Sequence, residues 1–156
     1  MPNDDDDDDD DDRDELTAES IDTFGITFSR PKYWEARIEA REPPTYLWWD
    51  EDCGSFRITP MRFAANFELE PFLEGVFARE QASGHAPIWR TLSGRRCLAW
   101  IADAESRCHF YVTGRGELVI TISYAYDPDM LDDDYEQDLV EIGLEQVDAV
   151  LASLVF

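Results

Sequence analysis

The sequence has few of the side chains that form structural zinc sites, since its 156 residues include only two histidines and three cysteines. Structural zinc sites pair their ligands at short intervals, such as C-x₂₋₄-C or H-x₃₋₅-H. Cys97 and Cys108 are eleven residues apart. Cys108 and His109 are neighbours on a predicted strand, where successive side chains point to opposite faces. The sequence therefore predicts neither a metal site nor a bound cofactor.

The sequence also lacks a nucleophile with an adjacent base. Cys53 follows Glu51 and Asp52. Those carboxylates would raise the pKa of its thiol, whereas a nucleophilic cysteine needs a lowered pKa. No G-x-S-x-G motif is present. We therefore expect no catalytic residues and a non-catalytic protein. The alternative is a small hydrolase that uses Cys53 or an Asp/His pair in a cleft.

Long apolar runs are absent as well. None approaches the ~20 residues that a membrane span requires, and no basic and then apolar leader opens the chain. The number of cysteines is odd, and their spacing does not match that of a disulfide-bonded framework. These features predict a reducing, cytoplasmic setting.

Basic residues are scarce, with 13 Lys and Arg against 36 Asp and Glu and a formal net charge of −23. Residues 4–15 hold eleven acids and one arginine and carry −10, so the rest of the chain carries −13. An acidic chain repels phosphates and anionic lipid headgroups, which disfavours binding to nucleic acid or to a membrane surface. The charge instead favours a protein partner with a basic surface.

Residues 1–20 are predicted to form a disordered poly-Asp tail, because like charges keep such a segment extended and solvated. Solubility is its expected role, with loose binding of divalent cations or mimicry of a polyanion as alternatives. Residues 21–156 are predicted to form a single α+β domain.

Alternating apolar residues predict the strands of this domain. Two early runs are Ile21–Ser29 and Trp34–Ala40, the second with one half-buried face. Thr45–Phe63 is predicted to be a hairpin around a turn that ends at Gly54. Four more strands are expected at Ile88–Ser93, Arg96–Ala102, Cys108–Thr113 and Glu117–Tyr126. Because short gaps join them, neighbours should pair antiparallel, and either the first run or Ile88–Ser93 is expected to be irregular.

Two segments have helical spacing instead. Apolar residues recur at three and four residues from Glu68 to Gln81 and again from Tyr135 to Leu154. The predicted order is four strands, a helix, four strands and a helix. This order is typical of an antiparallel sheet of about six to eight strands flanked by two helices.

This order of elements, with Gly25-Ile26-Thr27-Phe28-Ser29-Arg30-Pro31 and then Trp34 at the start of the domain, resembles the PsbP/DcrB-like family. The hairpin over residues 48–63 is similar to that of small bacterial proteins of unknown function with the same fold. The resemblance covers residues 21–155 and implies an α/β/α sandwich. It also implies a binding or assembly factor, of the kind that acts on photosystem subunits or small GTPases. In size and charge the chain also resembles acidic immunity proteins that neutralise bacterial toxins.

Two surfaces are predicted to bind a partner. The first is the acidic loop Asp127–Asp134, whose candidate residues are Asp127, Asp129, Asp132, Asp133 and Asp134. Capping of the following helix is an alternative role for these aspartates. Weak cation binding is another, although Leu131 and Asp132 break the calcium-loop pattern. The second surface surrounds Trp49. It adjoins Trp48, so one of the two faces the core, and the other either faces out or lies under a helix. An exposed tryptophan is a good interface anchor.

Overall fold

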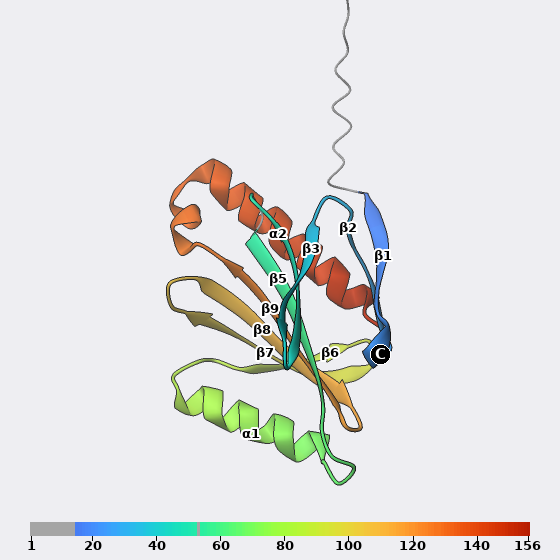
Figure 1. The fold of residues 1–156 in the computed structure, drawn as a ribbon. Coiled ribbons are helices and arrows are strands. Elements are labelled where there is room, and N and C mark those ends of the chain that lie inside the picture. The colour runs from blue at the N-terminus through green and yellow to red at the C-terminus, as the bar shows by residue number, and fades with distance from the viewer. Residues whose placement is uncertain (1–14, 53) are drawn as a thin grey trace, which may run out of the picture.

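The computed structural model describes residues 15–52 and 54–156. The predictions for residues 1–14 and for Cys53 lie outside the described residues. The described chain forms three layers, with a seven-stranded antiparallel sheet between the helices α1 (Leu69–Ala82) and α2 (Asp134–Ser153), as Figure 1 shows. The predicted α+β sandwich is confirmed. No helix of the described part combines the length and the apolar character needed to cross a membrane.

The sheet has the strand order β3-β4-β5-β9-β8-β7-β6, and all of its pairs are antiparallel. The strands are β3 (Glu35–Arg41), β4 (Pro44–Asp50), β5 (Gly54–Arg62), β6 (Ile88–Leu92), β7 (Arg95–Asp103), β8 (Arg107–Arg115) and β9 (Leu118–Tyr126). The predicted hairpin is confirmed as β4 and β5. Its Gly54 has a φ of +87°, and a Cβ there would lie 2.5 Å from the carbonyl oxygen of Ala125.

The N-terminal part differs from the prediction. Leu16–Ile21 forms β1, which pairs with β2 (Ile26–Pro31) in a separate two-stranded sheet. The described chain therefore has five strands before α1. The predicted strand Ile21–Ser29 is interrupted after Ile21, so the irregularity expected for it is confirmed, and its residues from Ile26 onward belong to β2. A short 3₁₀-helix, Asp22–Phe24, and Gly25 at a φ of +66° turn the chain between β1 and β2. The ordered fold includes Leu16–Ser20, which the sequence assigned to the tail because of the charges before it.

The prediction of a half-buried strand over Trp34–Ala40 is wrong. Trp34 is buried, but every residue of β3 is exposed. β3 lies at the edge of the sheet, and a bulge between Ile38 and Ala40 shifts its register. Its alternating charges suit an edge strand, since charged side chains discourage pairing with another chain.

The larger core lies on the face of the sheet that α2 covers, here called the α2 face. Phe56 and Ile58 of β5 and Ile120 and Ile122 of β9 are at most 1% exposed. They pack with one side of α2 and with β2. The helical pattern predicted for Tyr135–Leu154 is confirmed, since α2 buries the residues that recur at this spacing, among them Val140, Val147 and Leu151.

The opposite face, here called the α1 face, has a smaller core. Leu73 and Val76 of α1 are buried against Leu98 of β7 and Val112 of β8. Half-buried aromatic side chains surround this cluster, among them Phe63, Phe67, Phe72, Phe77 and Phe110. The helix predicted for Glu68–Gln81 is confirmed, and it covers only part of this face.

Candidate functional site

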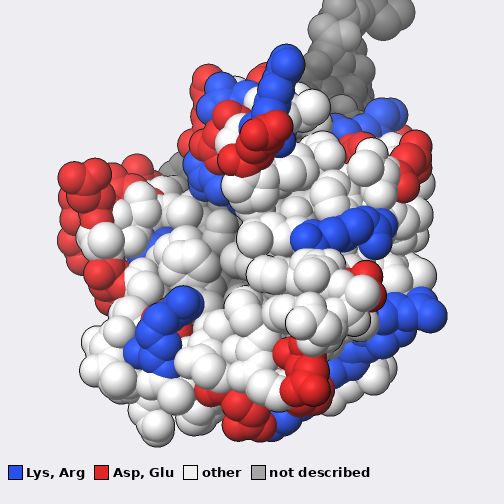
Figure 2. All heavy atoms as spheres, turned by 60° about the horizontal axis from the view of Figure 1, so that its bottom comes forward, with Lys and Arg blue, Asp and Glu red and all other residues white. Residues whose placement is uncertain are grey.

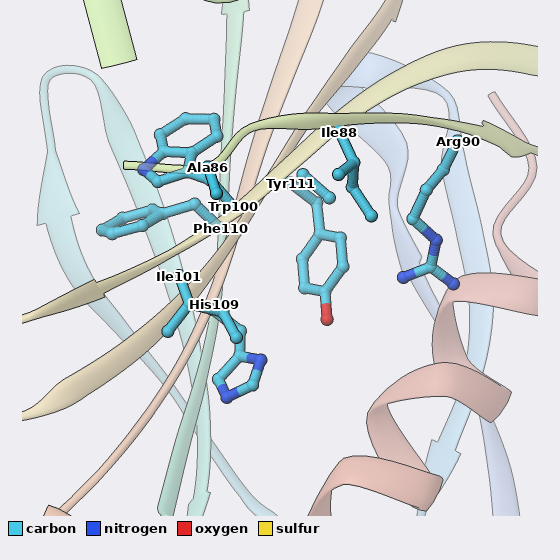
Figure 3. Close-up of a pocket in the computed structure, with 9 residues that line it drawn as sticks. Ala86, Ile88, Arg90, Trp100, Ile101, His109, Phe110 and Tyr111 are labelled. Carbon is cyan, nitrogen blue, oxygen red and sulfur yellow. The ribbon is translucent and has the colours of Figure 1, made fainter. Parts of the chain in front are cut away.

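A groove opens on the α2 face beside the edge strand β6. Its cavity of about 270 Å³ is bounded by β6, β7 and β8 and by Ala86, which precedes β6. Figure 3 shows the residues around it. In this view Arg90, Tyr111 and His109 point to the same side of the strands, away from the rings of Trp100 and Phe110. We call this feature the α2-face groove.

Two isoleucines form the mouth of the α2-face groove. Ile88 on β6 is 57% exposed and Ile101 on β7 is 50% exposed. The buried Ala99 lies on β7, two residues before Ile101, and pairs with Ile88 in the ladder. Large aliphatic side chains are usually buried, and neighbouring exposed ones often mark a contact surface. The groove therefore presents apolar surface that no described element covers.

Arg90 and Tyr111 form the polar end of the groove, next to α2. The Arg90 guanidinium lies 3.7 Å from Asp148 of α2, and its Cζ lies 5.6 Å from the centre of the Tyr111 ring. Burial and the nearby Asp148 carboxylate raise the pKa of Tyr111, against the lowering effect of Arg90. Tyr111 therefore stays a neutral phenol at pH 7. Because Asp148 is well exposed, its pairing with Arg90 contributes little stability.

His109 lies at the other end of the groove. Its Nε2 is 3.1 Å from the hydroxyl oxygen of Tyr126 on β9. The pKa of His109 is lowered, mainly by burial and secondly by the positive charge of Arg107. Burial raises the pKa of Tyr126. Both groups are therefore neutral at pH 7. Among the described residues, no hydrogen bond joins His109 to a thiol or a carboxylate, so this end of the groove offers polar contacts and no assembled nucleophile.

The predicted acidic loop is a short 3₁₀-helix, η3 (Pro128–Asp132), followed directly by α2. The Asp127 carboxylate accepts a hydrogen bond from the backbone N–H of Asp129 at 2.9 Å. Asp133 accepts two, from the N–H groups of Tyr135 and Glu136, both at 3.0 Å. Asp133 therefore caps α2, which confirms the predicted capping of that helix, and Asp127 caps η3.

The other three predicted aspartates, Asp129, Asp132 and Asp134, are exposed. Figure 2 shows acidic residues gathered on the left, the side on which η3 and the start of α2 lie in Figure 1. In the described chain no three His, Cys, Asp or Glu side chains are arranged to hold a metal ion. Asp127 directly follows Tyr126, so this acidic segment begins where the groove ends.

Trp49 lies apart from the groove. It is half-buried on the α1 face of β4, opposite the buried Trp48. The expectation that only one of the two faces the main core is confirmed. Trp49 is not among the described residues that pack beneath α1. Since β5, β9 and β8 separate β4 from β7, the structure does not bring Trp49 together with the α2-face groove.

The residues of the groove have no distinguishing signal in the sequence. Ile88 and Ile101 stand beside other apolar residues, Trp89 and Trp100, just as core positions do, and His109 resembles an ordinary strand histidine. What exposes the two isoleucines is the path of α2 across the sheet, which their own segments do not determine. Only the three-dimensional arrangement identifies them.

Comparison with known proteins relates the chain to one fold. No family model matches it, and no curated protein matches it. The solution structure of cyanobacterial PsbP (CyanoP) from Synechocystis sp. PCC 6803 superposes with a TM-score of 0.57 at 15% identity, over 90% of this chain and 91% of that chain. The chain has a PsbP-like fold. The resemblance predicted from the sequence is thus confirmed for the architecture.

A second solved structure, from Bacteroides thetaiotaomicron VPI-5482, superposes with a TM-score of 0.61 at 14% identity. The match covers 83% of this chain and 44% of that one, so the chain spans less than half the length of the Bacteroides protein. At these identities the two matches establish the PsbP-like fold and leave the function to be argued from the site.

Proposed function

We propose that this PsbP-like chain is a non-catalytic binding protein whose α2-face groove receives an apolar side chain from a basic segment of a protein partner. One observation carries the proposal, namely the two half-exposed isoleucines, Ile88 and Ile101, at the mouth of an apolar cavity. The cavity of about 270 Å³ is below the roughly 300–1,000 Å³ typical of pockets for small molecules. It suits a single large side chain.

The charges around the groove support a basic partner. Asp148 lies beside Arg90 at one end, and the exposed residues Asp129, Asp132 and Asp134 lie beyond Tyr126 at the other. The chain as a whole carries −23. Complementary charge speeds association and selects among partners, so lysine or arginine should flank the apolar anchor. If the chain is an immunity protein, as its size and charge suggested, the partner is a basic toxin that it neutralises.

The chemistry of the described thiols supports a non-catalytic role. Burial raises the pKa of the Cys97 thiol to about 11 and also raises the pKa of Cys108. Neither would be a thiolate at pH 7, so neither is an activated nucleophile. Both are free cysteines, which agrees with the reducing, cytoplasmic setting that forms part of the proposal. A binding or assembly role is also what the resemblance to PsbP-like proteins implies.

Selection from a random peptide library tests this function. The full chain is the bait, and the double variant Ile88→Ser/Ile101→Ser is the counter-bait. We expect peptides with one large apolar residue beside lysine or arginine, whose affinity falls as salt rises. Leu16→Ser/Val155→Ser is the matched control, because it removes two aliphatic side chains that are 56% and 61% exposed elsewhere. Peptides that bind both serine variants equally, or that lack basic residues, would contradict the proposal.

A further inference from the structure

A second cavity lies on the α1 face, and the proposed function does not use it. It has a volume of about 400 Å³ and lies between α1 and the strands β7, β8 and β9. Phe72 and Val76 line it from α1, and Ala102 and Phe110 line it from the sheet. Figure 2 looks onto this side of the molecule and shows a hollow flanked mostly by uncharged residues. We call this cavity the α1 cleft.

One wall of the α1 cleft is an aromatic pair. The rings of Trp100 and Phe110 are stacked, with centroids 5.1 Å apart and planes 20° from parallel. Trp100 is buried, whereas Phe110 is only half-buried. An aromatic pair with a partly open face can extend its stack to one more flat ring, because offset stacking is a favoured arrangement. The cleft is therefore shaped for a planar aromatic group.

The polar edge of the α1 cleft is a histidine held by a carboxylate. The Glu80 carboxylate, 12% exposed, lies 2.8 Å from Nδ1 of His85 and accepts a hydrogen bond from Nε of Arg79 at 3.1 Å. Burial acts to raise the pKa of Glu80, but the hydrogen bonds from His85 and Arg79 outweigh it and lower that pKa. Glu80 is thus an ionised acceptor. It keeps the imidazole proton on Nδ1, so Nε2 is the nitrogen available to a ligand.

We infer that the α1 cleft binds a small planar aromatic compound that carries a hydroxyl group, with its ring against Phe110 and its hydroxyl hydrogen-bonded to Nε2 of His85. A hydroxyl suits this nitrogen in either charge state, because it donates to a neutral imidazole and accepts from a protonated one. Thr121 lines the same cleft from β9. A mostly apolar pocket with a few convergent polar groups is the usual form of a small-molecule site. The inference is independent of the groove on the opposite face.

Two matched probes test the α1 cleft on the full chain, 2-naphthol and naphthalene, which differ by the hydroxyl alone. Titration followed by tryptophan fluorescence should show saturable binding of 2-naphthol. Naphthalene should bind about three- to tenfold more weakly, the effect of one lost hydrogen bond. His85→Leu keeps the size of the side chain and removes the nitrogen, so it should make the two affinities equal.

Two further variants test whether the probes bind in the α1 cleft. Ala102→Phe fills the cleft and should abolish saturable binding of both probes, with circular dichroism confirming that the variant is folded. Ile101→Ser changes the other face of β7 and should leave the affinity for 2-naphthol unchanged. The inference is overturned if 2-naphthol does not saturate the wild type, if His85→Leu retains the difference between probes, or if Ile101→Ser alone weakens binding. Unchanged binding in a folded Ala102→Phe variant would overturn it as well.

Discussion

The two faces of the central sheet are packed to very different extents. Among the described residues, the core cluster on the α2 face contains 21 buried residues, most of them contributed by α2, by β1 and β2, and by six strands of the large sheet. The cluster on the α1 face contains six, beneath a single helix. Burial of apolar surface stabilises a fold by about 25 cal/mol per Å². The α2 face therefore supplies most of the stability of this fold, and the α1 face supplies less.

The open surfaces follow from this difference. α1 buries only Leu73 and Val76, so the sheet beyond its contacts stays uncovered and forms the α1 cleft. On the other face α2 packs closely on β2 and the centre of the sheet, and it leaves the groove near β6 open. The small groove thus lies beside a rigid core, where a partner's side chain would meet a preformed surface. The larger cleft lies under the less firmly packed helix.

A matched pair of core substitutions should give the largest effect. Leu151 of α2 is 2% exposed and Leu73 of α1 is 0% exposed. Replacing a buried leucine by alanine costs about 2–5 kcal/mol, and the cost is lower where the surroundings can collapse. We expect Leu151→Ala near the upper end of this range and Leu73→Ala near the lower end, because α1 can settle onto the sheet. Urea unfolding gives both free energies of unfolding, and an equal or larger loss for Leu73→Ala would refute the contrast.

The next largest effect is expected for variants of the α2-face groove, which should change the affinity for a partner and leave the stability of the fold nearly unchanged. For peptides selected on the wild type, Ile88→Ser and Ile101→Ser should each raise the Kd about tenfold, which corresponds to about 1.4 kcal/mol. Because both side chains are at least half exposed, each free energy of unfolding should change by no more than about 0.5 kcal/mol. Isothermal titration and urea unfolding measure the two quantities. A loss of stability as large as the loss of binding would make these isoleucines part of the core.

Periodicity of apolar residues predicts most of this fold because it reflects local rules. The helical spacing of Leu73 and Val76, and of Val140 and Val147, places these residues on buried faces, and α1 and α2 form where expected. β1 is missed because the run of aspartates before Leu16 conceals its short alternation. The exposure of β3 is missed because alternation shows that a strand exists but not whether it lies at an edge of the sheet.

The two cavities could not be predicted for a related reason. Ile88 and Ile101 become exposed only through the direction of α2, and Glu80 meets His85 only because the chain turns after the end of α1. The capping role of the acidic segment, in contrast, could be predicted. A helix cap involves residues that are close in the sequence, as Asp133 is to Tyr135 and Glu136. Contacts between distant segments decide the rest.

Thiol labelling should also distinguish the two faces, through the rates at which their cysteines react. Cys97 is 1% exposed on the α2 face, and Cys108 is half-buried on the α1 face. At pH 8 a thiol with a pKa of about 11 is ionised to roughly one part in a thousand. In a Cys53→Ser background, 4,4′-dithiodipyridine should label Cys108 about tenfold faster than Cys97, as mass spectrometry of digests can measure. Equal labelling rates for Cys97 and Cys108 would mean that both thiols become accessible in the same unfolding event, which would contradict the difference between the two faces.

The smallest effect concerns Glu80, which fastens the end of α1 to the segment that holds His85. At pH 7, Glu80→Gln should lower the free energy of unfolding by about 1 kcal/mol, the usual net contribution of one hydrogen bond, because glutamine has one acceptor oxygen where the carboxylate has two. The pKa of Glu80 is lower in the folded chain than the ordinary value of 4.5. Its carboxylate therefore stabilises the fold above about pH 4.5. This contribution is lost as the pH falls through the folded pKa.

Urea unfolding between pH 7 and pH 3.5 should thus show the wild type and Glu80→Gln converging as the pH falls. Glu141→Gln, at an exposed position of α2, is the control and should differ from the wild type by a constant, small amount. If the difference in free energy of unfolding between the wild type and Glu80→Gln instead grew as the pH fell, the protonated form of Glu80 would be the stabilising one. The more lightly packed face would then depend on α1 packing alone, without the ionised carboxylate that orients His85 toward the α1 cleft.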